Sequence, residues 1–302
     1  MPRLSMIVPF QRDENALEST LLSVLESRTE HDELIIVHSG EYTDPYQLDG
    51  DEAVVLESDR DAGMADQLNL AASVACSPVV QVLTPGIQVR DGWADEALDR
   101  MEAEHLDYLA LAISDAGSGE TIYGLDAREL PHRRVARRSP QSGGPVLGGS
   151  MIRRRTLLQM GGWCESIAAE LIDVEWAILS AMLELRGGVH AEAGLVTTQR
   201  NIIQPAVSYE LGKGCGMLAC AYGEIADSGI AIEPLVKRLG NLATGLMNPK
   251  LAAERLGWVL GVRDRSMVQR ITERVEAARQ GIAAMQSIRM PETEVATKRR
   301  AA

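Results

Sequence analysis

The chain has little cysteine and no long hydrophobic segment, and each shortage excludes a class of protein. Its four cysteines show neither CxxC spacing nor the density of a disulfide framework, so we expect reduced, buried thiols and no zinc site. No run of about 18 apolar residues occurs, and Met1-Pro2-Arg3 leads straight into the strand-like segment Leu4–Val8. We therefore expect no transmembrane helix and no signal peptide, and a cytoplasmic protein that could lie peripherally on the inner membrane face.

The chain is also short of positive charge. It holds 30 Lys and Arg against 43 Asp and Glu, and the net charge of −13 argues against general nucleic-acid binding, because phosphates would be repelled. The deficit is uneven, since residues 234–302 hold 13 basic residues against 6 acidic ones. We expect this basic segment to dock on the acidic remainder or to stay solvated. The alternative is contact of residues 234–300 with a protein partner or with anionic lipid.

Short hydrophobic runs alternate with helical periodicity in the first third of the chain. Strand-like runs cover Leu4–Val8, Leu34–Val37, Ala53–Leu56 and Val79–Leu83, and helical spacing covers Ala16–Leu25 and Ala65–Ala75. This alternation predicts an α/β fold with a mostly parallel sheet flanked by helices. Ligands bind such sheets at the carboxyl ends of the strands, so the residues that follow each strand are candidates for a site.

The rest of the chain continues in strands and helices and becomes helical toward its end. Further strands are predicted at Asp107–Ile113 and Val189–Thr197, and helices at Gly148–Gln159, Val174–Leu185, Pro249–Leu260 and Met267–Gln286. The final helix carries a heptad seam that would pack on the parent domain or form a coiled-coil dimer. We predict a domain over residues 1–225, a helical C-terminal extension over 226–290 and a disordered tail over 291–302.

Several polar segments have the order and spacing of one enzyme family. They are Ser5–Leu17, Asp61–Asn69 and Gly148–Trp163, followed by Ile172-Asp173-Val174-Glu175-Trp176. Together they resemble the family 2 glycosyltransferases of GT-A fold, over about residues 4–220. The resemblance implies that a sugar passes from a nucleotide-sugar donor to an acceptor hydroxyl with inversion of configuration. It does not identify the acceptor.

The resemblance assigns roles to individual residues. The donor-binding candidates are Pro9, Asp13, His38, Asp61, Asn69 and Thr84. The catalytic candidate is Asp173, which aligns with the general base of the family, and Glu170 could share that work. The alternative for the carboxylates is a structural one, because acidic residues commonly cap helices or stabilise their N-termini.

The sequence departs from the family pattern where metal and donor would be bound. Thr84-Pro85-Gly86 stands in place of one to three aspartates, His38-Ser39 replaces an aspartate pair, and Leu195–Thr198 lacks a late histidine. Hard cations such as Mn²⁺ and Mg²⁺ need several oxygen ligands, so we predict no metal site. A basic side chain can hold a diphosphate instead. The clamp candidates are Arg153 and Lys213, the latter in a segment similar to the family's glycine-rich turn.

Three functions fit this pattern. The first is an active inverting glycosyltransferase that works without a metal. The second is a catalytically inactive relative that binds a nucleotide or a sugar. The third is an assembly module whose basic helical segment is the working surface. Binding of nucleoside diphosphates that does not respond to Mn²⁺ would favour the first.

Overall fold

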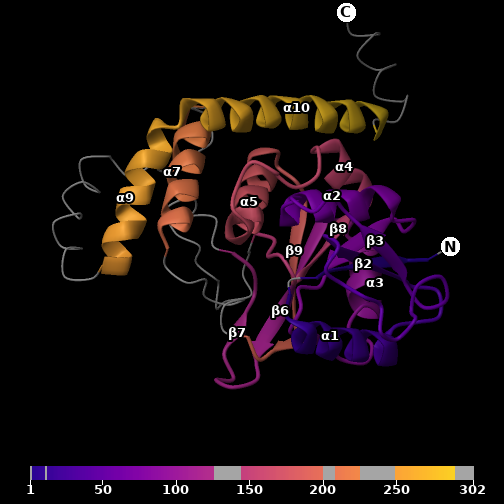
Figure 1. The fold of residues 1–302 in the computed structure, drawn as a ribbon. Helices are drawn as coiled ribbons and strands as arrows, with labels where there is room; N and C mark the ends of the chain where they lie inside the picture. The colour runs from indigo at the N-terminus through magenta and orange to yellow at the C-terminus, as the bar shows by residue number, and fades with distance from the viewer. Residues whose placement is uncertain (1, 11, 126–143, 200–207, 225–248, 290–302) are drawn as a thin grey trace, which may run out of the picture.

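The computed structural model describes residues 2–10, 12–125, 144–199, 208–224 and 249–289, which form a mixed sheet covered by helices (Figure 1). The strands are β1 (Leu4–Pro9), β2 (Glu33–His38), β3 (Val54–Glu57), β4 (Val79–Val82), β5 (Ile87–Val89), β6 (Tyr108–Asp115), β7 (Thr121–Ile122), β8 (Ser150–Arg153) and β9 (Gly187–Thr197). Their order in the sheet is β3-β2-β1-β4-β8-β6-β9-β5, and β7 pairs with β6. The predicted α/β class is confirmed.

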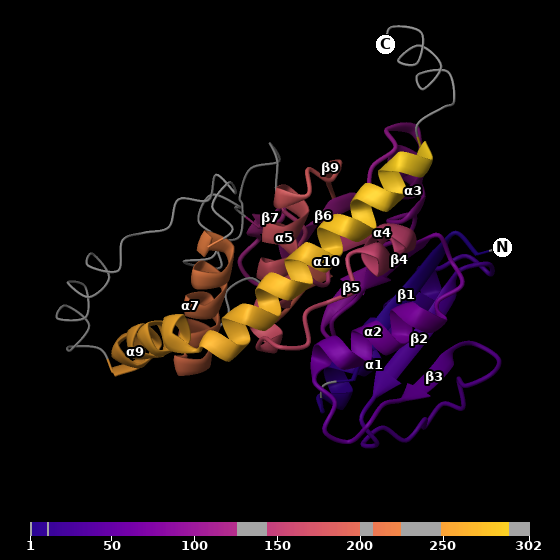
Figure 2. The same cartoon turned by 90° about the horizontal axis from the view of Figure 1, so that it is seen from above.

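Helices cover both faces of this sheet. They are α1 (Glu14–Ser27), α2 (Met64–Val74), α3 (Asp95–Ala103), α4 (Arg154–Gln159), α5 (Ile172–Met182), α7 (Tyr209–Glu224), α9 (Pro249–Arg263) and α10 (Arg265–Arg289), with a short 3-10 helix over Ala169–Leu171. Figures 1 and 2 show α2, α4 and α5 on one face and α1 and α3 on the other. Because both faces are covered, a central strand such as β1 is buried at every position and consists of apolar residues almost throughout.

The pairing of the strands brings several loops to one edge of the sheet. β1 runs parallel to β2 and β4, and β6 runs parallel to β9. β8 lies antiparallel between β4 and β6, so it begins beside the end of β4, whereas β6 continues beyond it to Asp115. The residues at this shared edge are Pro9, His38, Val82, Ser150 and Thr197. This is the edge at which a parallel sheet binds ligands.

The segment after Gly148 differs from the sequence prediction. We expected a helix over Gly148–Gln159, but Ser150–Arg153 forms strand β8, and helix α4 begins only at Arg154. Met151 and Ile152 are buried on β8 between two neighbouring strands. Pairing and burial inside a sheet outweigh the local helical spacing at this point.

Helix α10 packs across the domain. Its seam residues are all buried, as predicted for packing on the parent domain; they are Val268, Ile271, Val275, Ala278, Ile282 and Met285. Gly281 permits close approach to α4, because a Cβ there would lie 2.2 Å from the Gln159 carbonyl oxygen. Figure 2 shows α10 crossing over α4 and α5.

The predicted division of the chain at residue 225 stays a prediction. Residues 226–248, the start of the predicted extension, and residues 291–302, the predicted tail, lie outside the described residues. Among the helices that the structure describes, none combines the length and the hydrophobicity needed to cross a membrane.

Candidate functional site

The end of β1 leads into the capped start of helix α1. Pro9 is buried at the last position of the strand, and the Phe10 amide donates to the Val37 carbonyl at 2.8 Å. Asp13 is the N-cap of α1, and its Oδ1 accepts from the Ala16 amide at 3.0 Å. The capping alternative for Asp13 is therefore present, and its contact with a donor stays a prediction, as does that of Pro9.

His38 ends β2 and belongs to a group of aromatic rings. Its Nδ1 accepts from the Gly40 amide at 3.0 Å, which places the proton of the neutral ring on Nε2. The His38 ring centroid lies 5.6 Å from that of Tyr42, which lies 5.6 Å from that of Phe10. Burial, followed by the charge of Asp44, raises the pKa of Tyr42 to about 12. These three rings form an aromatic cluster beside the ends of β1 and β2.

Asn69 does not have the role predicted for it. Its Oδ1 accepts from the Trp163 amide at 2.7 Å, and its Nδ2 donates to the Trp163 carbonyl at 2.9 Å and to Glu165 Oε1 at 2.9 Å. Both ends of the amide group thus bind the segment after α4, so we correct the donor-binding assignment to a structural one. Asp61 is exposed in the loop that follows β3, and its donor contact stays a prediction.

The turn after β4 does not fit a divalent metal. The Gly86 amide donates to Thr20 Oγ1 at 2.9 Å, and the Gly86 carbonyl accepts from Thr197 Oγ1 at 3.0 Å. Thr84 Oγ1 is buried and has no hydrogen-bond partner among the residues that the structure describes. It is the one side-chain oxygen that Thr84, Pro85 and Gly86 provide. Mn²⁺ and Mg²⁺ bind to sets of oxygen ligands that include carboxylates, and this turn supplies none.

The end of β9 lies against the same turn, where the family pattern would place a histidine. Gly86 has a φ of +93°, and a Cβ on it would lie 2.6 Å from the Gln199 side chain. Among the described residues, the group of side chains close enough to hold a metal is Glu96, His190 and Glu192. That group lies on α3 and earlier in β9, away from the turn.

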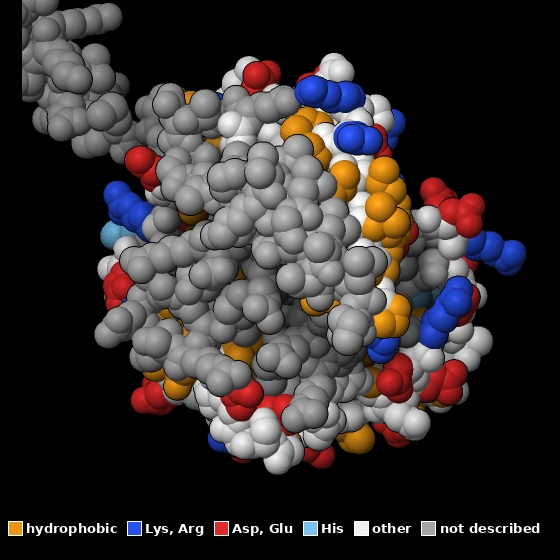
Figure 3. Space-filling model, turned by 90° about the vertical axis from the view of Figure 1, so that its left-hand side faces the viewer, with side chains coloured by type: hydrophobic (Ala, Val, Ile, Leu, Met, Phe, Trp, Pro, Cys, Tyr) orange, Lys and Arg blue, Asp and Glu red, His pale blue; other side chains and the backbone are white. Residues whose placement is uncertain are grey.

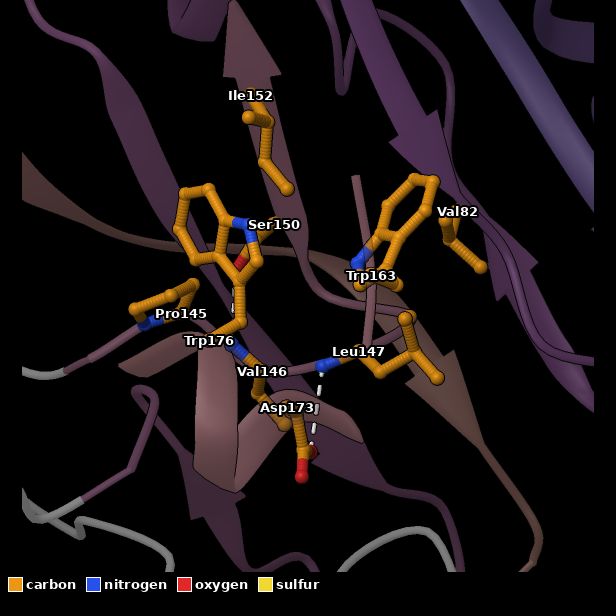
Figure 4. Close-up of a pocket in the computed structure, with 10 residues that line it drawn as sticks. Val82, Pro145, Val146, Leu147, Ser150, Ile152, Trp163, Asp173 and Trp176 are labelled. Carbon is orange, nitrogen blue, oxygen red and sulfur yellow. Dashed lines mark hydrogen bonds between the residues drawn. The ribbon is translucent and has the colours of Figure 1, made fainter. Parts of the chain in front are cut away.

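Asp173 lies in a pocket at the same edge of the sheet. The pocket is lined from β4, β8 and α5, by Trp163 after α4, and by residues 145–148. Asp173 is 5% exposed in the first turn of α5, and its Oδ2 accepts from the Leu147 amide at 3.3 Å. In Figure 4 the carboxylate lies at one end of the pocket, and the indole rings of Trp163 and Trp176 lie toward the other. A carboxylate held in this way can accept a proton from a hydroxyl group that enters the pocket.

Gly148 joins this pocket to the turn after β4. It has a φ of +89°, and a Cβ on it would lie 2.8 Å from Thr84 Oγ1 and 2.6 Å from Ile87 Cδ1. The preceding residue, Leu147, is the one whose amide binds Asp173. The carboxylate and the end of β4 therefore belong to one site.

We expect Gly148→Ala to lower the free energy of unfolding by about 1–3 kcal/mol through backbone strain, and by more through the clash with Thr84. Gly92→Ala is the matched control, because Gly92 has a φ of +72° but no atom within 4 Å of a Cβ. Urea denaturation of both variants measures the difference. Equal losses would contradict the close packing of Gly148 on the turn.

A comparison with models of protein families identifies the family of the chain. The family model described as glycosyl transferase family 2 matches residues 5–161, which is more than half of the chain. The chain belongs to glycosyl transferase family 2. The resemblance inferred from its motifs is thereby confirmed.

Solved structures confirm the GT-A fold of this family 2 protein. The crystal structure of S. aureus TarS 1-349 in complex with UDP-GlcNAc matches with a TM-score of 0.58 and 16% identity, over 91% of this chain and 83% of that one. TarS 1-349 in complex with UDP matches with a TM-score of 0.54 and 13% identity, over 94% and 91%. At such identities the likeness concerns the fold. No curated protein matches the sequence.

Arg153 is not placed to clamp a diphosphate in this family 2 protein. It ends β8 opposite Val79, the first residue of β4, and so lies at the far edge of the sheet from Asp173. Its guanidinium donates to the Leu106 carbonyl at 2.7 Å and to the Met101 carbonyl at 2.8 Å. We correct its role to binding the carbonyls at the end of α3.

Lys213 lies in helix α7, and the predicted glycine-rich turn is part of that helix. Gly212 lets α7 approach α9, since a Cβ there would lie 1.9 Å from the Glu254 carbonyl oxygen. Lys213 Nζ lies 3.7 Å from Asp264 Oδ2. The predicted glycine-rich turn is therefore a packed stretch of helix, and the contact of Lys213 with a diphosphate stays a prediction.

The sequence analysis missed a buried ion pair behind the pocket. Glu175, named there only as part of the motif around Asp173, is 0% exposed and accepts from Arg274 Nε and from the Tyr222 hydroxyl, each at 2.9 Å. Burial and then the charge of Glu175 raise the pKa of Tyr222 well above its usual value. Burial lowers the pKa of Arg274, but Glu175 and its neighbours more than offset this, so the net direction is upward. No local motif signals this contact, because its partners lie 99 residues apart.

Proposed function

We propose that the protein transfers a sugar from a nucleotide-sugar donor to an acceptor hydroxyl, with Asp173 as the general base. The observation that carries the proposal is the buried Asp173 carboxylate in a pocket that adjoins the end of β4 through Gly148. A donor bound at the ends of β1, β2 and β4 would lie next to this pocket. The TarS structures of similar fold contain UDP-GlcNAc and UDP, which supports a nucleoside diphosphate sugar as the donor class.

The proposed reaction is a single displacement. The acceptor oxygen forms a bond to the anomeric carbon of the donor sugar while the bond from that carbon to the diphosphate breaks. Asp173 takes the hydroxyl proton, and the diphosphate leaves with the bonding electrons from the opposite side. The configuration at the anomeric carbon is therefore inverted. Apolar side chains that line the pocket, such as Val82 and Trp163, would limit the entry of competing water.

The leaving diphosphate needs a source of positive charge, and Arg153 lies at the far edge of the sheet. Among the described residues, Arg12 and Arg60 lie in loops that follow β1 and β3 at the donor edge. Arg12 has a positive φ of 63°, and its side chain forms two hydrogen bonds with Glu41, at 2.6 Å and 2.7 Å. Such strained positions are common at binding sites. We propose Arg12 as a contact to the diphosphate, which would exchange Glu41 for phosphate oxygens.

We expect removal of divalent metals to leave the transfer rate within about twofold of its original value, because the Thr84–Gly86 turn has no carboxylate to bind them. Rates are measured after treatment with EDTA, and again with added Mn²⁺ or Mg²⁺. Arg12→Ala is expected to weaken donor binding under all these conditions. A strong activation by Mn²⁺ would show that the chain binds metal through residues other than this turn.

Calorimetric titration with a panel of nucleoside diphosphates and nucleotide sugars, followed by transfer and hydrolysis assays, tests the proposed function. Binding together with turnover supports it. Binding without turnover identifies the catalytically inactive relative. Absence of all binding contradicts the proposal and favours the assembly module.

The contact of residues 234–300 with a partner or a membrane, and the cytoplasmic location, stay proposals. Helix α9 exposes Leu256 and Leu260, which are 51% and 40% accessible. Figure 3 shows a stripe of hydrophobic side chains on this side of the molecule. Pelleting with vesicles of anionic lipid, compared between the natural chain and a Leu256→Ser, Leu260→Ser variant, tests the membrane proposal without removing any packed helix.

A further inference from the structure

Arg274 makes an unusual number of contacts for one side chain. From helix α10 it donates to both carboxylate oxygens of Glu175, with Nε to Oε1 at 2.9 Å and Nη2 to Oε2 at 3.3 Å. The same guanidinium donates to the carbonyls of Met160 at 3.2 Å, Gly161 at 3.1 Å and Gly162 at 2.7 Å. Its side chain is 14% exposed. The rigid fork of arginine is suited to binding several oxygens at once.

The two groups that Arg274 binds are close in sequence to residues that line the pocket. Glu175 is two residues after Asp173 on α5 and is followed by Trp176. Gly162 is followed by Trp163, which lines the pocket as Trp176 does. Figure 4 shows both indole rings and the Asp173 carboxylate around the same space. The Arg274 guanidinium therefore links helix α5, which carries Asp173, to the turn that precedes Trp163.

The turn that Arg274 binds ends helix α4, where the Gly161 amide donates to the Leu158 carbonyl at 3.0 Å and the Gly162 amide to the Leu157 carbonyl at 2.9 Å. These bonds satisfy the amides of the turn, whereas its carbonyls are bound by Arg274. Gly161 and Gly162 have φ values of +80° and +74°, a region in which glycine is mobile when nothing holds it. On its far side the turn is held by Asn69, which binds the backbone of Trp163. Asn69 and Arg274 thus fix the segment from opposite directions.

We infer that Arg274 is a positioning residue for the proposed reaction. Through Glu175 and the Gly161–Gly162 turn, it sets the distance between Asp173 and Trp163, the ring on the other side of the proposed acceptor pocket. The inference rests on the proposed function, and it assigns to the C-terminal helix a part in building the acceptor site. Arg274 acts through its neighbours and is not placed to touch the substrate. Its loss should therefore act on the rate of transfer and not on the binding of the donor.

The test compares Arg274→Met with Arg270→Met, a change of an exposed arginine one turn earlier on α10. We expect Arg274→Met to lower kcat about 10- to 100-fold while KM for the donor stays within about twofold, because a small misplacement of a reacting group costs rate. Arg274→Lys should recover part of kcat, since an ammonium can pair with Glu175 but cannot bind all the carbonyls. Arg270→Met should leave both constants unchanged.

A double variant separates positioning from stability. Replacing both partners of a buried ion pair with apolar residues commonly restores stability that a single replacement loses. Glu175→Leu combined with Arg274→Met should therefore unfold at a urea concentration closer to that of the natural protein than Arg274→Met alone, while kcat remains low. A double variant with both stability and kcat restored would overturn the inference, and so would a folded Arg274→Met protein with unchanged kcat.

Alkylation of Cys164 gives a readout that does not depend on activity. Cys164 follows Trp163 and is 4% exposed, and burial, then the charge of Glu175, raises the pKa of its thiol to about 11. If Arg274 holds the segment around Trp163, the rate at which Cys164 is alkylated under native conditions should rise about tenfold in Arg274→Met and should not rise in Arg270→Met. A natural protein that is inactive with every nucleotide sugar contradicts the proposed function. Unchanged alkylation of Cys164 in Arg274→Met contradicts the inference itself.

Discussion

Asp173→Asn is expected to lower kcat for sugar transfer by about 100- to 10,000-fold, the usual contribution of a general base. The amide has nearly the same shape as the carboxylate and can still accept the hydrogen bond that the Leu147 amide donates at 3.3 Å. It cannot take a proton from the acceptor hydroxyl at neutral pH. The fold and the affinity for the donor should therefore be retained, which calorimetry with the donor and steady-state kinetics with saturating acceptor measure separately.

Glu170→Gln is the control for this experiment. Glu170 lies on the 3-10 helix just before α5 and is exposed, whereas Asp173 is 5% exposed. We expect its replacement to change kcat by less than about twofold, as surface changes away from a site usually do. If both variants lose activity equally, Glu170 shares the catalytic work. If neither does, Asp173 is not the base.

The sheet was predictable from the sequence because its strands are short apolar runs between helical segments. β1, β2 and β4 lie within a residue of their predicted bounds. His38 is the last residue of β2, and Thr84 lies in the turn after β4. Strand β8 was not predictable, since Met151 and Ile152 become a strand only through pairing with β4 and β6. The alternation of apolar runs and helical segments predicts parallel strands, and parallel strands bind ligands at their carboxyl ends. The edge of the sheet that carries the site could therefore be predicted.

The directions of individual side chains were not predictable. Asn69 matches its motif, yet its amide binds the backbone of Trp163, a contact that depends on how α4 packs against α2. Arg153 is the last residue of strand β8, and the antiparallel pairing of that strand with β4 places it at the edge of the sheet far from Asp173. Lys213 lies among glycines whose purpose is the close approach of α7 and α9. A motif gives the residue type, whereas the partner of a side chain depends on tertiary packing.

Glu175→Gln is expected to lower the free energy of unfolding by about 3–5 kcal/mol, because breaking a buried ion pair leaves an uncompensated charge. Glu175 is 0% exposed and Arg274 is 14% exposed, so water cannot replace the lost carboxylate charge. The glutamine can still accept one hydrogen bond from Arg274 or from Tyr222, which should keep the loss at the lower end of that range. Urea denaturation at neutral pH measures it.

The matched control is Glu276→Gln, a change of an exposed glutamate on α10. It is expected to alter stability by no more than about 0.5 kcal/mol. Because Glu175 and Tyr222 also join α5 to α7, through a hydrogen bond of 2.9 Å, the loss should be shared by three helices and appear as one cooperative transition. A Glu175→Gln protein as stable as the natural one would mean that the hydrogen bonds to the carbonyls of residues 160–162 are enough to hold the Arg274 guanidinium in place. In that case the carboxylate is present to hold α5, and with it Asp173, at a fixed distance from α10.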